Sequence, residues 1–562
     1  MLYALLNQYY GFSSFRPGQE EIINDILNGK NVIGVMPTGG GKSLCFQLPA
    51  LMLEGVTIVI SPLIALMKDQ VDRLSKYNIP ATFINSSISP NEIQNRLNFI
   101  KEGKCKLLYI APERFYSREF VEQLKNIKVS LFAIDEAHCI SEWGHDFRPS
   151  YLRLRGAIDM LGNPPVLALT ATATPEVRID IQKQLSIPEA SCYITGFDRP
   201  NLRYYTLRCN DNEKIENILN YCKKNEGPGI IYMGTRQKVE NMVDFLENYG
   251  ISAHRYHAGM DSKERTKIQE DFMAEKKKII VATNAFGLGI DKPNIRFVIH
   301  FDIPGTLESY YQESGRAGRD GNPSDCILFY SPQDRFLREF FLQGENPSTE
   351  TIKQIYSILA AQINDPILFT YKEISEQLSE KAPDMAVSAA LKIFEKHNII
   401  ERPQERSING YLKFLKPERE VRELIGQKAK IQQKLMDYLI STFIGELEEG
   451  VNLNIDEIVR ALDIKRDTIA RMMKKLTDEA AVKYEPPFRG SEVRLLRRVH
   501  PEELSSIIDF SAIEEKKNRS FSKLDIIENF VFHLGCRRKY ILDYFGERHP
   551  GNCGNCDNCI SR

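Results

Sequence analysis

Lys42 and Ser43 end a glycine-rich stretch, IGVMPTGGGKS, that has the residue types of a phosphate-binding loop. Residues 32–35, where this stretch begins, are expected to form a buried strand, residues 38–41 a glycine-rich loop, and a helix is expected to start at Lys42. Glycines let successive backbone N–H groups turn toward an anion, and a helix N-terminus adds partial positive charge. The lysine would reach the β- and γ-phosphates of ATP and the serine would hold Mg²⁺. Met36 replaces the first glycine of the strict pattern, so a chance glycine-rich turn is the alternative. The predicted ATP-binding loop residues are Thr38, Gly39, Gly40, Gly41, Lys42 and Ser43.

Two adjacent acids, Asp135 and Glu136, follow the apolar run in LFAIDEAH. An acid after a buried strand can hold Mg²⁺ through water, and its neighbour can orient or deprotonate an attacking water. We predict these two roles for Asp135 and Glu136 respectively. Solvated loop acids are the alternative.

A pair of arginines, Arg316 and Arg319, stands in the sequence QESGRAGRDG. Their spacing predicts that both project from one helical face. Guanidinium groups there would stabilise charge on a phosphoryl group during its transfer, and a surface arginine pair is the alternative.

Four cysteines near the end of the chain have the spacing C-x16-C-x2-C-x2-C: Cys536, Cys553, Cys556 and Cys559. Four thiolates at this spacing predict a closed tetrahedral Zn²⁺ site with a structural role. The other seven cysteines are scattered, which suits reduced thiols inside a cell. We therefore expect a structural Zn²⁺ that folds the segment from about 516 to 560.

Two further stretches near the predicted ATP site carry residues for base recognition. Gln19, at an expected helix start in FRPGQ, could hydrogen-bond an adenine edge, with Phe12 and Arg16 stacking on the base. The alternative is a loop arginine and a surface glutamine.

The second stretch, CISEWGHDFRPSY, follows the acids directly and contains the only tryptophan of the chain. Trp143, His145 and Phe147 could stack on bases while Arg148 meets a phosphate. The alternative is that Trp143 and Phe147 fill a core under the loop.

The elements that must position these residues form two series of short apolar runs with helical stretches between them. The first series is VTIVIS, KLLYIAP, LFAIDEAH and PVLALTATA, and the second is GIIYM, SAHRYH, IIVATN, RFVIHF and CILFY. Polar residues gather where the runs end, as in parallel sheets with helices on both faces. We predict an α/β fold with two such lobes, of which only the first carries a phosphate loop. The second would then complete a site at the interface.

Length and composition fit this reading. The 562 residues, 42% of them hydrophobic, suffice for about three to five domains. No leader and no run of about 18 apolar residues is present, so we expect a cytoplasmic protein without a membrane partner. A net charge of −1 gives no global signal for nucleic acid, so any such site must come from local patches.

The C-terminal third predicts two winged-helix plans in succession. In the first, YKEISEQL and DMAVSAALKIFEKHNII are helices and YLKFLKP is the returning strand. In the second, NIDEIVRAL and KRDTIARMMKKLTDE are helices and VKYEPPFRGSEVRLLRR forms the wing. The second is basic, with Arg471, Lys474 and Lys475 on one helical face, and we read it as a duplex-binding domain with Phe488 and Arg489 at a hairpin tip. A purely structural domain is the alternative for both.

The motifs resemble those of RecQ-type superfamily 2 DNA helicases in order and spacing. These are FRPGQEEII, MPTGGGKSLC, SPLIALMKDQV, LLYIAPER, DEAHCISEWGHDFRP, ALTATAT, FDRPN, YHAG, FGLGIDKPN and QESGRAGRDG. The resemblance implies two RecA-like lobes, a DEAH box, ATP hydrolysis and 3′-to-5′ movement on single-stranded DNA. It places both arginines near the γ-phosphate, adds Gln312 to the cleft, and has Thr283, Gly287, Gly289 and Asp291 couple nucleotide to DNA. It further implies DNA or coupling roles for His138, Ser61, Lys68, Arg114, Thr235 and Arg236.

The order of the C-terminal parts departs from that family, in which the zinc module directly follows the second lobe and precedes a winged helix. We therefore expect RecA-like lobes at 1–196 and 197–345, winged-helix domains at 346–420 and 421–500, and a helical hairpin with the zinc module at 501–562. The predicted function is an ATP-dependent DNA helicase in repair and recombination, acting on single-stranded and tailed or forked DNA near the nucleoid. A single-stranded-DNA-binding protein is a candidate partner. An RNA helicase and an ATP-gated scaffold without unwinding are the alternatives.

Overall fold

The computed structural model describes residues 1–287, 292–402, 409–425, 429–486, 490–549 and 551–561. The chain forms two compact units, one of residues 1–339 with 519–562 and one of residues 340–518. Two of the predicted residues with a role in coupling, Gly289 and Asp291, and the hairpin-tip residues Phe488 and Arg489 lie outside the described residues. No described helix is both long and apolar enough to cross a membrane.

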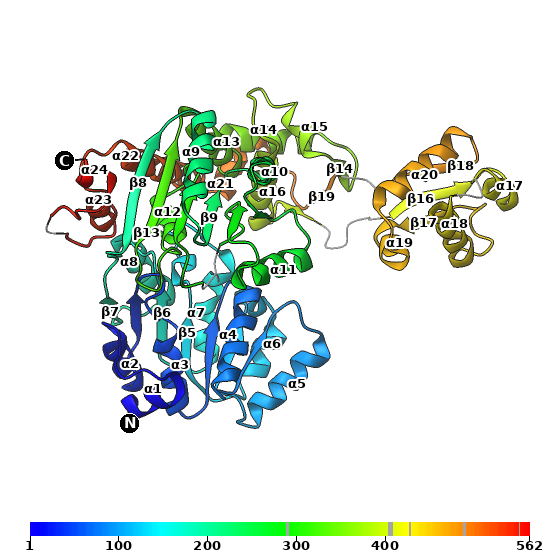
Figure 1. Cartoon of the computed structure of the whole chain (residues 1–562). Helices are drawn as coiled ribbons and strands as arrows, with labels where there is room; N and C mark the ends of the chain where they lie inside the picture. Colours follow the sequence, from blue (N-terminus) through cyan, green and yellow to red (C-terminus); the bar gives the residue numbers. More distant parts are fainter. Residues whose placement is uncertain (288–291, 403–408, 426–428, 487–489, 550, 562) are drawn as a thin grey trace. The chain divides into compact units, whose positions relative to one another are not determined.

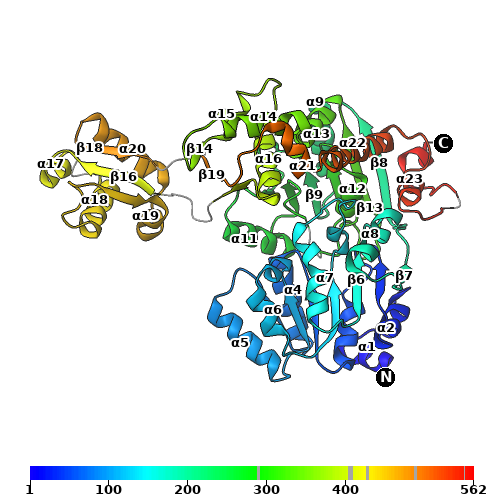
Figure 2. The ribbon, with the colours of Figure 1, turned by 180° about the vertical axis from the view of Figure 1, so that it is seen from behind.

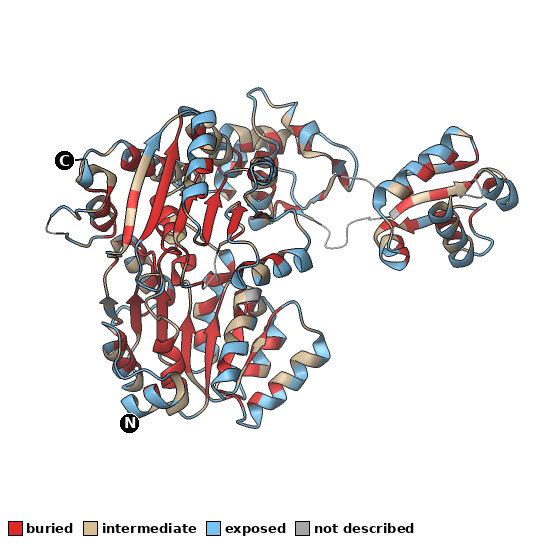
Figure 3. Ribbon diagram, in the orientation of Figure 1, coloured by how far each residue is buried: buried red, intermediate tan, exposed pale blue. Residues whose placement is uncertain are grey.

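The first unit begins with a lobe built on a seven-stranded parallel sheet (Figure 1). In spatial order its strands are β3 (Ala81–Ile84), β4 (Leu107–Ile110), β2 (Val56–Ile60), β5 (Val129–Ile134), β6 (Val166–Thr170), β1 (Val32–Val35) and β7 (Ser191–Ile194). Its helices are α1 (Leu2–Tyr10), α2 (Gln19–Leu27), α3 (Leu44–Met52), α4 (Ile64–Lys76), α5 (Pro90–Lys101), α6 (Arg118–Leu124), α7 (Leu154–Met160) and α8 (Pro175–Leu185). The central strands are buried along their length because helices cover both faces (Figures 2 and 3).

The second lobe repeats this plan with six parallel strands. Their spatial order is β10 (Ala253–Tyr256), β11 (Ile279–Ala282), β9 (Gly229–Tyr232), β12 (Phe297–His300), β13 (Ser324–Tyr330) and β8 (Leu202–Arg208). Its helices are α9 (Asp211–Lys224), α10 (Arg236–Asn248), α11 (Ser262–Met273), α12 (Leu307–Ser314) and α13 (Pro332–Glu345). The prediction of an α/β fold with two parallel-sheet, RecA-like lobes is confirmed.

The C-terminal segment of the first unit packs against the second lobe. Helix α22 (Phe510–Phe532) leads into α23 (Arg537–Tyr544) and α24 (Asp557–Ile560), and the last two lie beside β8 (Figure 1). Phe545 stacks on Phe197, with ring centroids 4.5 Å apart, so the end of the chain is fixed to the segment that joins the two lobes.

The second unit contains two small domains, each with a three-stranded antiparallel sheet. One combines α14 (Thr349–Ala360), α15 (Tyr371–Ser375) and α16 (Asp384–Lys396) with β14 (Ile367–Phe369), β19 (Ser491–Leu495) and β15 (Ile400–Glu401). The other combines α17 (Glu418–Glu423), α18 (Lys430–Thr442), α19 (Ile455–Leu462) and α20 (Arg466–Asp478) with β17 (Val451–Asn454), β16 (Asn409–Phe414) and β18 (Val482–Glu485). Helix α21 (Leu504–Ile507) packs in the core of the first of these domains.

The predicted partners of two strands are wrong. YLKFLKP, expected to complete the first winged helix, supplies β16, which pairs with β17 and β18. The first sheet is instead completed by β19, which pairs with β14 and β15. Accordingly, Leu412 of β16 and Val493 of β19 lie in different cores. Since β15 precedes residue 402 and β19 follows residue 490, the domain at 409–485 is inserted into the wing of the first, and the expected boundaries 346–420 and 421–500 do not hold.

Candidate active site and zinc site

The phosphate loop lies between β1 and α3, at the carboxyl end of a central strand. Gly39 and Gly41 have φ values of 81° and 82°, a conformation that favours glycine. A side chain at Gly41 would also come within 2.5 Å of the Gln19 amide nitrogen. Met36, which departs from the strict motif, is buried in the core of the lobe beside Cys45. The replacement of the first glycine therefore affects packing below the loop and leaves the cradle itself intact.

Lys42 sits inside this cradle and donates hydrogen bonds to the carbonyl oxygens of Met36 and Pro37, at 3.4 and 3.5 Å. Burial lowers the pKa of Lys42, while Glu136 and Asp135 oppose this effect. The ammonium group thus faces the two acids from across the loop. Ser43 is the N-cap of α3 and, within the described part of the chain, its hydroxyl makes no capping hydrogen bond.

The two acids follow β5 without a break. Asp135 accepts a hydrogen bond from the Glu136 N–H at 3.0 Å, and burial together with the Glu136 charge raises the pKa of Asp135 to about 7. Glu136 has a φ of 50°, a left-handed conformation that is unfavourable for a residue with a side chain. Ser43 and Asp135 supply oxygen donors, the type that Mg²⁺ prefers, so these residues fit that ion.

A pair of histidines links Glu136 to the segment of residues 139–151, which contains Trp143 and Phe147 and is called the aromatic loop below. The Nδ1 atom of His138 lies 3.4 Å from a carboxylate oxygen of Glu136 and 2.9 Å from the Thr170 hydroxyl. His145 stacks on His138 with ring centroids 4.4 Å apart. Burial lowers the pKa of each imidazole to about 4, so both rings are neutral near pH 7. The aromatic loop is therefore in direct contact, through His145, with the histidine that faces Glu136.

The N-terminal residues predicted to read a base contact the phosphate loop. Gln19 is buried, accepts a hydrogen bond from the Arg16 N–H at 2.9 Å and donates one to the Gly41 carbonyl at 3.0 Å. The Arg16 guanidinium donates to the Gly39 carbonyl. Phe12 is 54% exposed. The Gln19 amide thus connects this segment to the loop, in addition to any bond it makes with a nucleotide.

The two arginines lie in a turn, and the predicted helical face is wrong. Helix α12 ends at Ser314, and residues 315–320 form turns in which Gly318 adopts a φ of 56°. The Arg319 side chain lies against the phosphate loop, with its Cγ 3.4 Å from where a Cβ on Gly39 would stand. Arg316 is buried and points into a neighbouring cavity. The second lobe therefore meets the ATP cradle of the first at this turn.

Arg199 is a residue of this interface that our reading of the sequence missed. Its guanidinium donates to the Thr38 carbonyl of the phosphate loop and to the Gly315 carbonyl of the arginine turn, both at 3.1 Å. It also donates to the Ala317 and Gly318 carbonyls, both at 2.9 Å. The only available signal was its place in the FDRPN motif. Arg199 thus connects the phosphate loop of the first lobe to the arginine turn of the second by hydrogen bonds.

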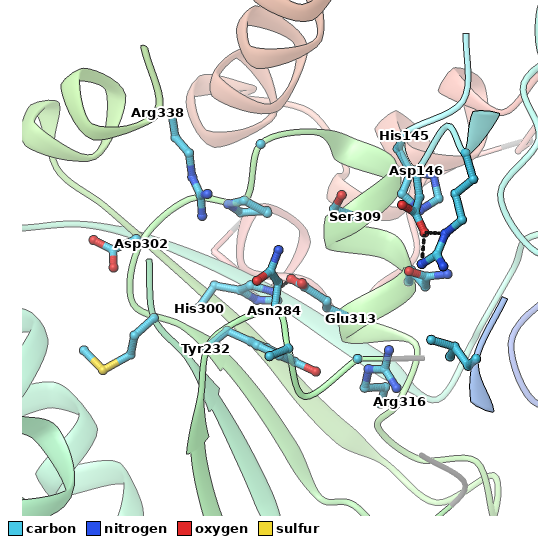
Figure 4. Close-up of a pocket in the computed structure, with 18 residues that line it drawn as sticks. His145, Asp146, Tyr232, Asn284, His300, Asp302, Ser309, Glu313, Arg316 and Arg338 are labelled. Carbon is cyan, nitrogen blue, oxygen red and sulfur yellow. Dashed lines mark hydrogen bonds and ion pairs between the residues drawn. The ribbon is translucent and has the colours of Figure 1, made fainter. Parts of the chain in front are cut away.

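The cavity that Arg316 enters has a volume of about 390 Å³ and is lined by both lobes. His145, Asp146 and Arg148 contribute from the aromatic loop, and Gln312 joins Arg316 from the second lobe (Figure 4). Arg148 forms an ion pair with Asp146 at 3.0 Å and donates to the Pro62 carbonyl at the same distance. The loop thus faces the arginine turn across a polar space.

Most of the other predicted nucleic-acid residues lie beyond the carboxyl ends of strands. Ser61 follows β2, Thr235 caps α10 after β9, and Thr283 follows β11. The remaining members of the set are Gly287, Lys68 on α4, Arg114 after β4 and Arg236 on α10. Phe147 is half-buried in the aromatic loop, and Trp143 is 40% exposed. Arg471, Lys474 and Lys475 belong to the second unit, where all three are exposed on α20.

The four cysteines form one cluster whose ligand atoms all lie within 4.8 Å of one another. The Sγ atoms of Cys553 and Cys559 are 3.9 Å apart, close to the separation of about 3.8 Å that tetrahedral Zn–S bonds of about 2.3 Å require. Backbone N–H groups of Cys553 and Arg537 point at the sulfur atoms of Cys536 and Cys556. Four thiolates with such support fit Zn²⁺ and leave no coordination position for a substrate.

Comparison with known proteins agrees with this geometry. Residues 16–179 match the DEAD/DEAH box helicase model, 211–321 the helicase conserved C-terminal domain and 494–560 the RecQ zinc-binding model. Two solved structures share the fold at a TM-score of 0.50. They are the DEAD-box helicase Mss116 bound to ssRNA, 16% identical over 70% of this chain and 85% of that one, and the DUF1998 helicase MrfA bound to DNA, 19% identical over 72% and 58%. The lobes and their shared site therefore define a helicase core of the superfamily with two RecA-like domains.

The curated relatives are more specific. The ATP-dependent DNA helicase RecQ of Bacillus subtilis is 50% identical over 343 residues, 60% of this chain and 58% of that protein. The RecQ of Haemophilus influenzae is 46% identical, over 62% of this chain and 57% of that protein. The probable ATP-dependent DNA helicase RecS of B. subtilis is 44% identical over 64% of this chain and 72% of that protein. The chain belongs to the RecQ family, and it spans little more than half the length of the two RecQ proteins.

Proposed function

We propose that the chain is an ATP-dependent DNA helicase that moves 3′ to 5′ along single-stranded DNA and unwinds duplex ahead of it. This proposal rests on the contact between the two lobes, in which Arg199 and Arg319 of the second lobe meet the phosphate loop of the first. A site divided between two lobes lets nucleotide binding and hydrolysis close and reopen the cleft, which is how such cores turn hydrolysis into movement.

Each residue of the divided site has a specific role in this proposal. Lys42 binds the β- and γ-phosphates, and Glu136 orients the attacking water. Arg319, beside the phosphate loop, stabilises charge on the transferred phosphoryl group. Arg316 and Gln312 line one cavity together with the aromatic loop, and we assign them the role of coupling that loop to the ATP site. Ser43 and Asp135 would hold Mg²⁺, which neutralises phosphate charge when bound.

Single-stranded DNA would cross the carboxyl ends of the strands in both lobes. Backbone N–H groups, hydroxyls such as Ser61, Thr235 and Thr283, and the cations Lys68, Arg114 and Arg236 would contact phosphates, which needs no strongly basic surface. Trp143 and Phe147 would stack on bases.

Duplex DNA would bind the inserted domain through α20. Arg471, Lys474 and Lys475 are the exposed cations that we assign to this contact. The Arg471 guanidinium also donates to the Asp467 carbonyl at 3.2 Å, and the Lys475 ammonium donates to the Leu424 carbonyl at 3.0 Å. The helix occupies the second position of a helix-turn-helix, which enters the major groove in many DNA-binding proteins.

We further propose that a resident Zn²⁺ folds the C-terminal module, that tailed or forked DNA is the substrate and that the protein acts in DNA repair or recombination. A cytoplasmic, nucleoid-associated location and a single-stranded-DNA-binding partner belong to the same proposal. The match of residues 494–560 to the RecQ zinc-binding model supports the Zn²⁺ assignment, and similarity to proteins named as DNA helicases supports DNA as the substrate.

The test is unwinding of a labelled duplex with a 3′ single-stranded tail. The purified chain should separate it in the presence of ATP, and should leave a 5′-tailed duplex and a 3′-tailed RNA duplex intact. Lys42→Ala and Glu136→Gln should abolish the reaction. DNA-stimulated ATP hydrolysis without strand separation would favour the scaffold, and equal unwinding of RNA would favour the RNA helicase.

A further inference from the structure

Helix α22 of the zinc module contacts the tryptophan of the aromatic loop through two cations. The Arg519 guanidinium lies 4.3 Å from the centroid of the Trp143 ring, a cation–π distance. One turn further along, the Lys523 ammonium donates to the Trp143 carbonyl at 2.6 Å. Because the two cations are four residues apart, they project from the same face of the helix. The loop is thus held at both its ring and its backbone.

The helix that makes these contacts is itself fixed to the second lobe. Lys523 also pairs with Glu308 at 3.0 Å, and Glu308 is almost completely buried. Although burial tends to raise the pKa of Glu308, Lys523 and His145 hold it below its usual value, so the carboxylate stays charged. In addition, Asp525 pairs with Arg335 at 2.9 Å. A loop of the first lobe is therefore tied through α22 to the second.

The place that Arg519 occupies on the ring is a place where a nucleobase could stack. Trp143 has an exposed fraction of only 40%, and the guanidinium covers one face of the indole. Stacking of a base on an aromatic ring contributes more free energy than a cation–π contact at an exposed site. A bound single strand could therefore displace Arg519, whereas an empty protein would keep it.

Displacement of Arg519 from the Trp143 ring would change the surroundings of Glu136. From Trp143 the loop runs two residues to His145, which stacks on His138, and His138 faces Glu136 at 3.4 Å. Glu136 has a carboxylate oxygen that finds no hydrogen-bond partner within the described part of the chain. The loop is therefore connected, through the two stacked imidazoles, to the side chain to which we assign the attacking water.

We propose that Arg519 and Lys523 are positioning residues that hold the Trp143 loop in a docked state, and that a base of single-stranded nucleic acid takes the place of Arg519 on the indole. This inference rests on the proposed function, because it assumes that Trp143 receives a base. In the docked state hydrolysis is slow. Exchange of Arg519 for a base frees the loop and with it Glu136, so the zinc module limits hydrolysis in the absence of nucleic acid.

The single tryptophan makes the contact measurable without a label. Acrylamide quenching of Trp143 fluorescence is compared in the wild-type chain, Arg519→Gln and the conservative variant Arg519→Lys, with and without oligo-dT. Without DNA, Arg519→Gln should raise the quenching constant about two-fold because one ring face becomes accessible. Arg519→Lys should retain part of the protection. Lys539→Gln, which removes a half-exposed cation of the same module, is the matched control and should behave as wild type.

Hydrolysis is measured on the same samples. Arg519→Gln should raise the rate without DNA about five-fold, as expected for a modest coupling free energy, and should leave the DNA-saturated rate unchanged. If wild type responds to oligo-dT in fluorescence and hydrolysis but Arg519→Gln matches it in both measurements without DNA, the docking proposal is overturned. If oligo-dT changes neither signal in wild type, the proposed function fails and this proposal fails with it. Thermal melting of each variant confirms that the fold is retained.

Discussion

The two compact units use their residues in opposite ways. In the unit of residues 1–339 and 519–562, charged groups from distant segments converge on one site. Arg199 donates to the phosphate loop, and the two acids interact electrostatically with Lys42 of that loop. In the unit of residues 340–518, the cations of α20 lie on an exposed surface. Loss of one group from a converging site removes a function, whereas loss of one surface cation only weakens an affinity. The following predictions test this contrast in order of expected size.

The largest effect should come from Lys42→Ala. Loss of the ammonium that faces the phosphates should lower the rate of ATP hydrolysis by at least about 10³-fold, equivalent to about 4 kcal/mol of transition-state stabilisation. Steady-state phosphate release with saturating oligonucleotide measures it. Lys104→Ala, an exposed lysine of the same lobe, is the control and should retain the wild-type rate. Comparable loss in both variants would contradict a specific role.

Removal of the zinc site should have the next largest effect. Cys556 is completely buried, and Cys556→Ser should lose the bound metal and lower the unfolding free energy of the module by about 3 kcal/mol or more. Metal content and urea denaturation are measured together. Cys192→Ser removes an exposed thiol outside the cluster and should change neither. A metal-free Cys556→Ser variant with wild-type stability would show that Zn²⁺ has no folding role.

Arg199→Ala should produce an intermediate effect. It leaves four carbonyl acceptors of the two half-sites without their shared donor, so the lobes should close less often and kcat should fall about ten-fold. Binding of a fluorescent nucleotide to the first lobe should change far less than kcat. Arg118→Ala, an exposed arginine of the first lobe, is the control. A change confined to nucleotide affinity would place Arg199 outside lobe closure.

Charge reversal on α20 should give the smallest effect. Arg471→Glu together with Lys474→Glu should weaken binding of a forked duplex several-fold and reduce the salt dependence of affinity by about two ions, while ATP hydrolysis with single-stranded DNA stays unchanged. Fluorescence anisotropy over a salt series measures this. Arg419→Glu, an almost fully exposed cation on α17 of the same domain, is the control. A loss of hydrolysis in the double variant would remove the contrast between the units.

The same contrast explains what could be predicted from sequence. In the first unit the strands, the phosphate loop, the two acids and the four cysteines follow from motifs of a few residues, because strand ends of parallel sheets gather functional groups at one edge. The role of Arg199 was not predicted, because its four hydrogen-bond acceptors lie 116 or more residues away in the sequence. The contact of Arg519 with Trp143 was also not predicted, because it joins a loop of the first lobe to a helix 376 residues later in the chain.

In the second unit helices α15, α16, α19 and α20 were predicted, whereas helices α14, α17 and α18 and the pairing of the strands were not. β16 and β19 are short, and each places apolar side chains on one face, so either pattern fits either sheet. Only tertiary packing decides, and it puts Leu412 in one core and Val493 in the other. The arginine turn is a smaller case, because the spacing of Arg316 and Arg319 suits a helix, but helix α12 ends at Ser314, before either arginine.

The central claim is that ATP is hydrolysed between the phosphate loop of one lobe and Arg319 of the other. The most direct test is kcat of Arg319→Ala at saturating ATP and oligonucleotide, with nucleotide affinity measured separately. We predict a fall in kcat of about 10³-fold with affinity changed only a few-fold, because the guanidinium acts on charge that develops during transfer. A kcat within two-fold of wild type would contradict the account.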